Sequence, residues 1–279
     1  MFNALKEIEI VRVHDGRQHP DVDRAAAEEP LEVRLHGRPF AVIMRTPGAD
    51  LTLTAGFLLA ERVLTSADDL ATIEHCREQP TPDAAGGDHH PENVVNVTLA
   101  GGSAAGLEQA MADRRQVLGN SSCGLCGRLT IASLKTGVAP LTFGRRVAAA
   151  TIARLPDGLR DAQAVFKETG GIHAAGLFTV DGTVEAVAED VGRHNAVDKV
   201  IGQMLLADRL PLSDLILFVS GRTSFEIVQK AALAGLPVVG AVSAPSSLAV
   251  ELAREVGITL MGFTRGGSFN IYSHPERVS

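Results

Sequence analysis

The second half of the chain has the clearest pattern of apolar and polar positions. Three short runs are apolar throughout, as strands covered on both faces of a sheet are: Leu215–Val219, Val238–Val242 and Ile258–Phe263. The segments between them place apolar residues at helical spacing, so the pattern predicts strands joined by helices. Strands connected in this way pair in parallel through right-handed crossovers.

A hairpin and two helices are predicted before these strands. Asp181-Gly182 separates the apolar runs His173–Val180 and Val184–Glu189, and this dipeptide is a strong signal for a tight antiparallel turn. Helices are predicted over Pro156–Lys167 and over Arg193–Ala207, whose apolar residues share one face. The resulting order resembles the cytidine-deaminase-like fold, an α/β class with a mixed sheet and flanking helices.

The first half reads as strand-rich and irregular. Alternating residues predict half-buried strands at Glu7–His14 and Glu32–His36. A continuous apolar run predicts a further strand at Phe40–Met44, and another strand is predicted at Val94–Leu99. A helix is predicted after Asp50.

A domain boundary is expected near residue 150. It separates a smaller strand-rich domain, residues 1–150, from a deaminase-like domain, residues 151–279. The stretch Arg145–Arg160 contains Pro156 and Gly158 and shows no strong apolar face, which favours a boundary there.

Composition narrows the classes of function. The chain has 279 residues, a formal net charge of −7, one Tyr and no Trp, so neither a basic nor a base-stacking nucleic-acid surface is expected. No run approaches the ~20 apolar residues of a membrane span, and Met1–Val13 lacks the features of a secretory signal. Three cysteines cannot form a disulfide framework, so a cytoplasmic protein with reduced thiols is expected.

Polar, glycine-containing turns follow the three apolar strands. They are Ser220–Arg222, Ser243–Pro245 and Thr264–Ser268, and Asp190–Asn195 is a similar turn before a helix. Ligands of open α/β sheets bind at the carboxyl ends of strands, where guanidinium groups, amides and helix N-termini favour phosphate or another anion. Zinc deaminases need cysteine ligands at such turns, and these turns contain none, so no resident metal is expected.

The cysteine pair Cys123 and Cys126 lies in the open loop Ser121–Gly127. The start of a following helix and Arg128 would favour a thiolate there. Structural zinc would need two further ligands, and dithiol exchange of the thioredoxin type expects an apolar strand directly before the pair. Carriage of sulfur as a persulfide needs one exposed thiolate on a mobile loop and fits best.

Several long motifs together resemble the formate dehydrogenase accessory sulfurtransferases, the FdhD/NarQ family. In chain order they are Thr46–Glu61, Ser121–Gly127, Gly170–Phe178, Glu189–Lys199, Ser220–Lys230, Val242–Val250 and Gly262–Tyr272. The resemblance covers nearly the whole chain. It departs at the loop Gly86–His90 and at Arg62, where the family more often has glycine.

The resemblance implies a sulfurtransferase that receives persulfide sulfur from a cysteine desulfurase. The sulfur passes to a molybdenum cofactor, Mo-bis(molybdopterin guanine dinucleotide), before that cofactor enters formate dehydrogenase. Cys123 then matches the persulfide-bearing cysteine and Cys126 its partner, and a cytoplasmic homodimer is implied. The cofactor-binding segment is matched by Phe263, Thr264, Arg265, Gly266, Gly267 and Ser268.

Two other classes of function stay open from the residues alone. A non-catalytic chaperone could hold the molybdenum cofactor at the strand ends without using the cysteines. A metal hydrolase on the deaminase-like fold is disfavoured by the missing ligands.

Overall fold

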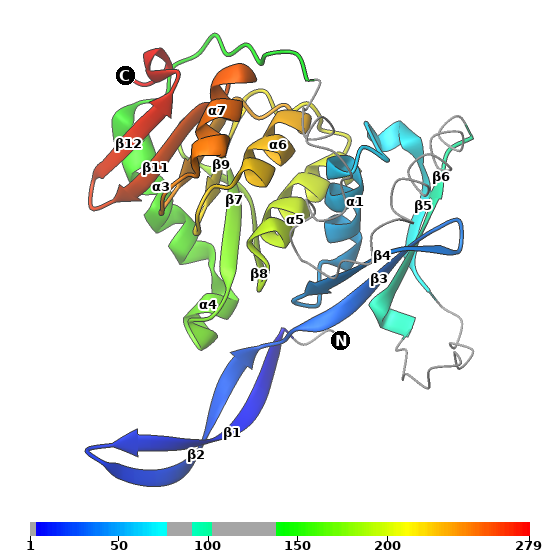
Figure 1. The fold of residues 1–279 in the computed structure, drawn as a ribbon, viewed down its shortest axis with the longest axis vertical. Helices are drawn as coiled ribbons and strands as arrows, with labels where there is room; N and C mark the ends of the chain where they lie inside the picture. The colour runs from blue at the N-terminus through cyan, green and yellow to red at the C-terminus, as the bar shows by residue number, and fades with distance from the viewer. Residues whose placement is uncertain (1–3, 77–90, 102–137) are drawn as a thin grey trace.

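The computed structural model describes residues 4–76, 91–101 and 138–279. In these parts the chain forms a mixed α/β fold with a six-stranded sheet, a four-stranded sheet and a separate two-stranded hairpin (Figure 1). Short 3-10 turns occur at Ala67–Asp69, Pro91–Asn93 and Pro275–Arg277. Among the described residues, no helix has the length and apolar character needed to cross a membrane.

The six-stranded sheet contains the three apolar strands and the hairpin that the pattern predicts. Its order is β12-β11-β10-β9-β7-β8, with β7 (His173–Thr179), β8 (Val184–Asp190), β9 (Leu215–Val219), β10 (Val238–Ala241), β11 (Thr259–Arg265) and β12 (Ser268–Ser273). The central strands β9, β10 and β11 are parallel, as predicted, and β7 pairs antiparallel with both β8 and β9. Strand β12, antiparallel to β11, was not predicted.

Helices cover both faces of this sheet. One face carries α5 (Arg193–Leu206), α6 (Phe225–Leu233) and α7 (Ser247–Glu255), and the other carries α3 (Ala149–Ala162). The alternation of strand side chains supplies both layers: Leu217 and Val219 join the core under α5–α7, whereas Ile216 and Phe218 join the core under α3.

The prediction of a single helix over residues 156–167 was wrong. The structure has α3 and then α4 (Ala164–Thr169), with Pro156 inside α3. Residues 145–160 also pack more tightly than expected, because Ile152, Leu155 and Leu159 lie on one face of α3 and are buried. Burying these three side chains offsets the hydrogen bond that the proline removes.

The four-stranded sheet is built from the first part of the chain. Its order is β4-β3-β6-β5, with β3 (Glu29–Leu35), β4 (Arg38–Arg45), β5 (Leu70–His75) and β6 (Val94–Leu99). Strands β3, β4 and β6 confirm predictions, with shifted ends for β3 and β4, and β5 was not predicted. Helix α1 (Asp50–Ala60) lies between this sheet and α5, so a single apolar core runs through both halves of the chain (Figure 1).

Strands β1 (Leu5–His14) and β2 (Arg17–Ala26) form a hairpin that projects away from the rest of the molecule (Figure 1). The prediction of a half-buried strand at Glu7–His14 was therefore wrong, because neither face of the hairpin lies against a core. Val11 and Val13 are 62% and 61% exposed. At the base of the hairpin, Arg24 forms a 2.6 Å ion pair with Glu168 of α4.

Candidate functional site at the carboxyl edge of the sheet

The turns that follow β9, β10 and β11 lie side by side at one edge of the six-stranded sheet. Thr223 and Pro245 form an isolated parallel bridge, and the amide of Phe263 donates to the carbonyl of Ser243 at 3.1 Å. Strand β7 runs antiparallel to β9, so it begins at this edge with His173, and β8, antiparallel to β7, ends there with Asp190. The predicted gathering of polar turns is thus confirmed.

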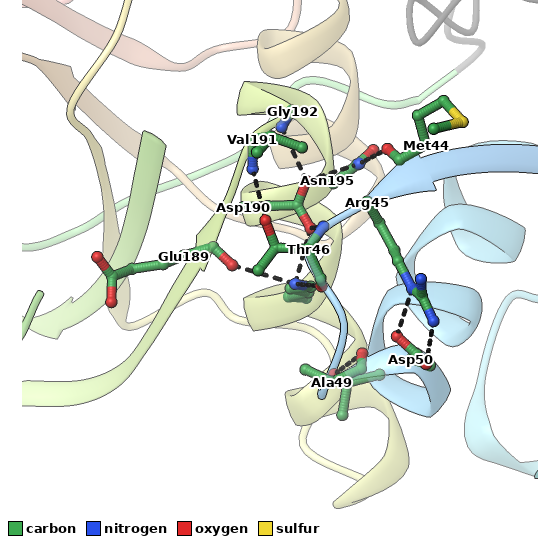
Figure 2. A network of polar contacts seen from close by, with 12 residues as sticks. Met44, Arg45, Thr46, Ala49, Asp50, Glu189, Asp190, Val191, Gly192 and Asn195 are labelled. Carbon is green, nitrogen blue, oxygen red and sulfur yellow. Dashed lines mark hydrogen bonds and ion pairs between the residues drawn. The ribbon is translucent and has the colours of Figure 1, made fainter. Parts of the chain in front are cut away.

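Asp190 organises the turn that opens α5 (Figure 2). Its buried carboxylate accepts from the amide of Gly192 and from Asn195 Nδ2, each at 2.8 Å, and from the amide of Thr46 at 3.1 Å. Asn195 also donates to the carbonyl of Met44 at 2.7 Å. Through these bonds one carboxylate ties the end of β4 to the start of α5.

A buried lysine completes this network. Lys199 Nζ lies 2.7 Å from the Asp190 carboxylate and donates to the carbonyls of Thr46 at 2.8 Å and Glu189 at 3.1 Å. The Glu189 carboxylate faces away and accepts from the first amides of α4, Val165 and Phe166. The charged residues of the motif 189–199 are thus largely used to hold backbone segments together.

A second buried group of ionisable residues lies between α5 and α6. Ser224 Oγ is 3.0 Å from His194 Nε2, and His194 Nδ1 is 3.5 Å from Glu226 Oε2. Lys230 lies 2.8 Å from Asp198 and 3.7 Å from Glu226. Burial raises the pKa of Asp198 to about 7, although the Lys230 ammonium opposes this rise.

His173 lies where the start of β7 meets the turn after β9. Its imidazole is close to Gly221, at which a Cβ would lie 3.3 Å from Nδ1. Partial burial lowers the pKa of His173, and the positive charge of Arg193 lowers it further. The neutral form of the His173 imidazole is therefore favoured, next to the positive charge of the Arg193 guanidinium.

The segment 263–268, predicted to bind the cofactor, is a hairpin turn. Strand β11 runs on to Arg265, Gly266 and Gly267 take positive φ angles of 56° and 80°, and β12 begins at Ser268. The expectation that the strand ends at Phe263 was wrong, because the glycine pair permits a tight turn two residues later.

Within this turn, exposed and buried side chains alternate. Phe263, Arg265 and Ser268 are exposed, and a Cβ on either glycine would meet no atom within 4 Å. Thr264 is fully buried, and among residues 4–76, 91–101 and 138–279 its hydroxyl finds no hydrogen-bond partner. The turn thus presents Arg265 and an open glycine pair to solvent, while the adjacent Thr264 side chain points into the protein.

Cys123 and Cys126 lie outside the described residues. Cys76, which follows β5, is a half-buried free thiol. No group of three or more His, Cys, Asp or Glu side chains suited to a metal ion occurs in the part of the chain that the structure describes.

The sequence argument did not single out Ser224 and Glu226 as site residues. Thr223 and Glu226 have the spacing of a capping box, in which Thr223 would be the cap, but the structure places the cap elsewhere. Ser224 is the N-cap, its side chain does not cap the helix, and the buried Thr223 hydroxyl has no hydrogen-bond partner in the part of the chain that the structure describes. The serine two positions before a glutamate was the available signal, but only the fold brings His194 to it.

The fold and the edge site define a mixed α/β protein in which polar turns, arginine side chains and a buried polar network gather at strand ends. A crystal structure from Desulfotalea psychrophila, named as a formate dehydrogenase accessory protein, has this fold, with a TM-score of 0.75 and 23% identity over 99% of this chain and 100% of that one. The model of the FdhD/NarQ family matches residues 26–279, so the chain belongs to the FdhD/NarQ family.

Relatives named sulfur carrier protein FdhD match along most of their length. The protein from Streptomyces avermitilis is 47% identical over 283 residues, covering 100% of this chain and 97% of the relative. The one from Streptomyces coelicolor is 48% identical, with coverage of 100% and 97%. The one from Mycobacterium tuberculosis is 49% identical, covering 91% of each chain.

Proposed function

We propose that this protein is a sulfur carrier that serves formate dehydrogenase. It acts as a sulfurtransferase, receiving persulfide sulfur from a cysteine desulfurase and delivering it to Mo-bis(molybdopterin guanine dinucleotide). The single observation that carries this proposal is the 47–49% identity, over at least nine tenths of the chain, to relatives named as sulfur carriers.

The transfer step uses the thiolate of Cys123. This thiolate attacks the terminal sulfur of the desulfurase persulfide, a new S–S bond forms, and the desulfurase cysteine leaves as a thiolate. Cys126 relays the sulfur or resolves a mixed disulfide. The bound sulfur then passes to the molybdenum centre of the cofactor, which is the substrate of the reaction: the S–S bond breaks, Cys123 leaves as a thiolate, and the reduced metal centre supplies the two electrons that take sulfane sulfur to sulfide.

The carboxyl edge of the six-stranded sheet suits the nucleotide ends of that substrate. The guanine nucleotides of the molybdenum cofactor carry diphosphates, which bind guanidinium groups and free backbone amides. Arg265 and the open Gly266–Gly267 turn offer both, and the buried hydroxyls of Thr223 and Thr264 have no partner among the described residues. Phe263 and Ser268 flank this turn and complete the proposed binding segment.

Two further features are part of the proposal. The six-stranded domain, residues 151–279, is of the cytidine-deaminase type, re-used for binding without a resident metal. The protein works in the cytoplasm as a homodimer.

Mass spectrometry after incubation with a cysteine desulfurase and cysteine tests the carrier role. The peptide that contains Cys123 should gain one sulfur atom, and Cys123→Ala should lose this gain together with support of formate dehydrogenase activity. Cys76→Ala is the matched control and should keep both. A Cys123→Ala variant that still supports full activity would refute the proposal.

The alternative is a cofactor chaperone that transfers no sulfur. It predicts that no cysteine peptide gains sulfur, and that Cys123→Ala binds the nucleotide as tightly as the wild-type protein does. Calorimetry with a guanine nucleotide tests the proposed binding segment. Arg265→Ala should weaken nucleotide binding, and an unchanged affinity would exclude Arg265 from the site.

A further inference from the structure

Ser224 occupies the N-cap position of α6 but does not cap the helix. Its hydroxyl lies 3.0 Å from His194 Nε2. The corresponding serine of α7, Ser246, behaves in the usual way, since its hydroxyl accepts from the amide of Ala249 at 3.3 Å. The Ser224 hydroxyl is therefore directed to an imidazole instead of to the helix.

His194 in turn faces a carboxylate. Its Nδ1 lies 3.5 Å from Glu226 Oε2, and both side chains are buried, at 5% and 6% exposure. The Lys230 ammonium, 3.7 Å from Glu226 Oε1, favours the ionised carboxylate. An anionic Glu226 favours the tautomer with hydrogen on Nδ1, and in that tautomer Nε2 carries the lone pair that accepts the proton of the Ser224 hydroxyl.

Hydroxyl, imidazole and carboxylate thus stand in the order that activates a serine nucleophile. The distance between His194 and Glu226 exceeds a normal hydrogen bond, as is frequent for such groups before substrate binds. Ser224 is half-buried and lies at the N-cap of α6, at the carboxyl edge of the sheet. The first amides of α6, on Phe225 and Glu226, have no acceptor within the helix and lie next to the nucleophile.

We propose that Ser224, His194 and Glu226 form a second reactive centre that cleaves carboxylic esters or thioesters. Ser224 is the nucleophile, His194 the general base, and Glu226 a positioning residue that acts through His194. This activity is separate from sulfur transfer and does not depend on it.

The reaction balances without any cofactor. Ser224 Oγ bonds to the acyl carbon while its proton passes to His194 Nε2, and the carbonyl oxygen becomes an oxyanion facing the first amides of α6. The bond to the leaving alcohol or thiol then breaks, and His194 returns the proton to it. Water releases the acyl group from Ser224 by the same steps in reverse.

The surroundings favour an anionic substrate. Arg193, adjacent to His194 in the chain, has a buried Nε that no described residue accepts from, and Arg222, two residues before Ser224, is exposed. His173 lies near Arg193 and is held neutral, so it does not add a charge there. An acyl or leaving group that carries a carboxylate or phosphate would pair with these guanidinium groups.

A fluorophosphonate probe tests the centre on the full-length protein. Ser224 Oγ displaces fluoride from phosphorus, so the tryptic peptide 223–230, in which Ser224 is the only serine, should gain the probe mass, with fragment ions separating Ser224 from Thr223. His194→Gln should slow labelling at least about 100-fold, the range expected for loss of a general base. Glu226→Gln should slow it as well, whereas Glu226→Asp should restore part of the rate.

Ser224→Ala should abolish labelling of this peptide, and Ser246→Ala is the matched control that removes a helix-capping serine but keeps the rate. Thermal melts of each variant identify loss of the fold, and only folded variants are compared. Failure of the folded wild-type protein to label at Ser224, or labelling that His194→Gln leaves unchanged, would overturn the proposal. Neither result bears on sulfur transfer, which the Cys123 experiment measures independently.

Discussion

Gly56 of α1 lies directly against the backbone carbonyl of Asp198 in α5. A Cβ at position 56 would overlap that carbonyl, and a Cβ at Gly202 would overlap the carbonyl of Thr52 in the same way. The two helices can approach this closely only because both positions lack a side chain. The contact joins the first part of the chain to the helix that carries His194.

Gly56→Ala should therefore destabilise the protein, because the added methyl group must push α1 away from α5. We expect the free energy of unfolding to fall by about 3 kcal/mol or more, the upper range for overpacking. Denaturant unfolding measures this. Gly144→Ala is the control, since Gly144 is exposed with no atom near its Cβ position, and equal losses in the two variants would contradict the close contact.

Asp190→Ala should be strongly destabilising because it leaves the Lys199 ammonium buried without its carboxylate. Removing one partner of a buried pair costs about 3–5 kcal/mol. In a double-mutant cycle, adding Lys199→Met should recover part of that loss. Asp157→Ala, which removes an exposed carboxylate from α3, should have little effect, and strict additivity of the two buried substitutions would contradict the network.

The buried carboxyl of Asp198 should make stability depend on pH. Its pKa is raised from 3.8 to about 7 by burial, so between these values the folded chain binds more protons than the unfolded chain. Stability at this site is therefore present at low pH and lost as the pH rises toward 7. Urea unfolding at pH 5 and pH 7.5 should show wild type losing stability relative to Asp198→Asn, and parallel pH curves would contradict the shift.

His173 should titrate below its ordinary value of 6.5, because burial and the charge of Arg193 disfavour the imidazolium. Since the unfolded chain takes up this proton more readily, the site loses stability as pH falls below 6.5. NMR titration, assigned with His173→Asn, should show Arg193→Gln raising the pKa of His173. Arg222→Gln is the control from the same edge, and an identical shift in both variants would exclude a specific effect of Arg193.

The regular elements of the second half were predictable because each carries its own periodicity. Strand β9 has the predicted bounds, Leu215–Val219, and the Asp181-Gly182 turn joins β7 to β8 as expected. Strand β12 was missed because Ser268–Ser273 mixes polar and apolar residues at an edge of the sheet, where it pairs on one side only among the described strands. The Glu7–His14 pattern misled for a related reason, since alternation does not reveal whether a core lies beneath the strand.

The residues alone were enough to predict an α/β fold, polar turns at the strand ends, and a family resemblance carried by motifs from Thr46 to Tyr272. These three predictions depend on the spacing of apolar residues and on the chemical character of residues that are neighbours in the sequence. Only the tertiary structure decided that Asp190 serves as a structural anchor for β4 and α5, and that Ser224 meets His194 thirty residues away. Such pairings are set by how helices and strands pack in three dimensions, and no periodicity along the chain encodes the distance between side chains on different elements.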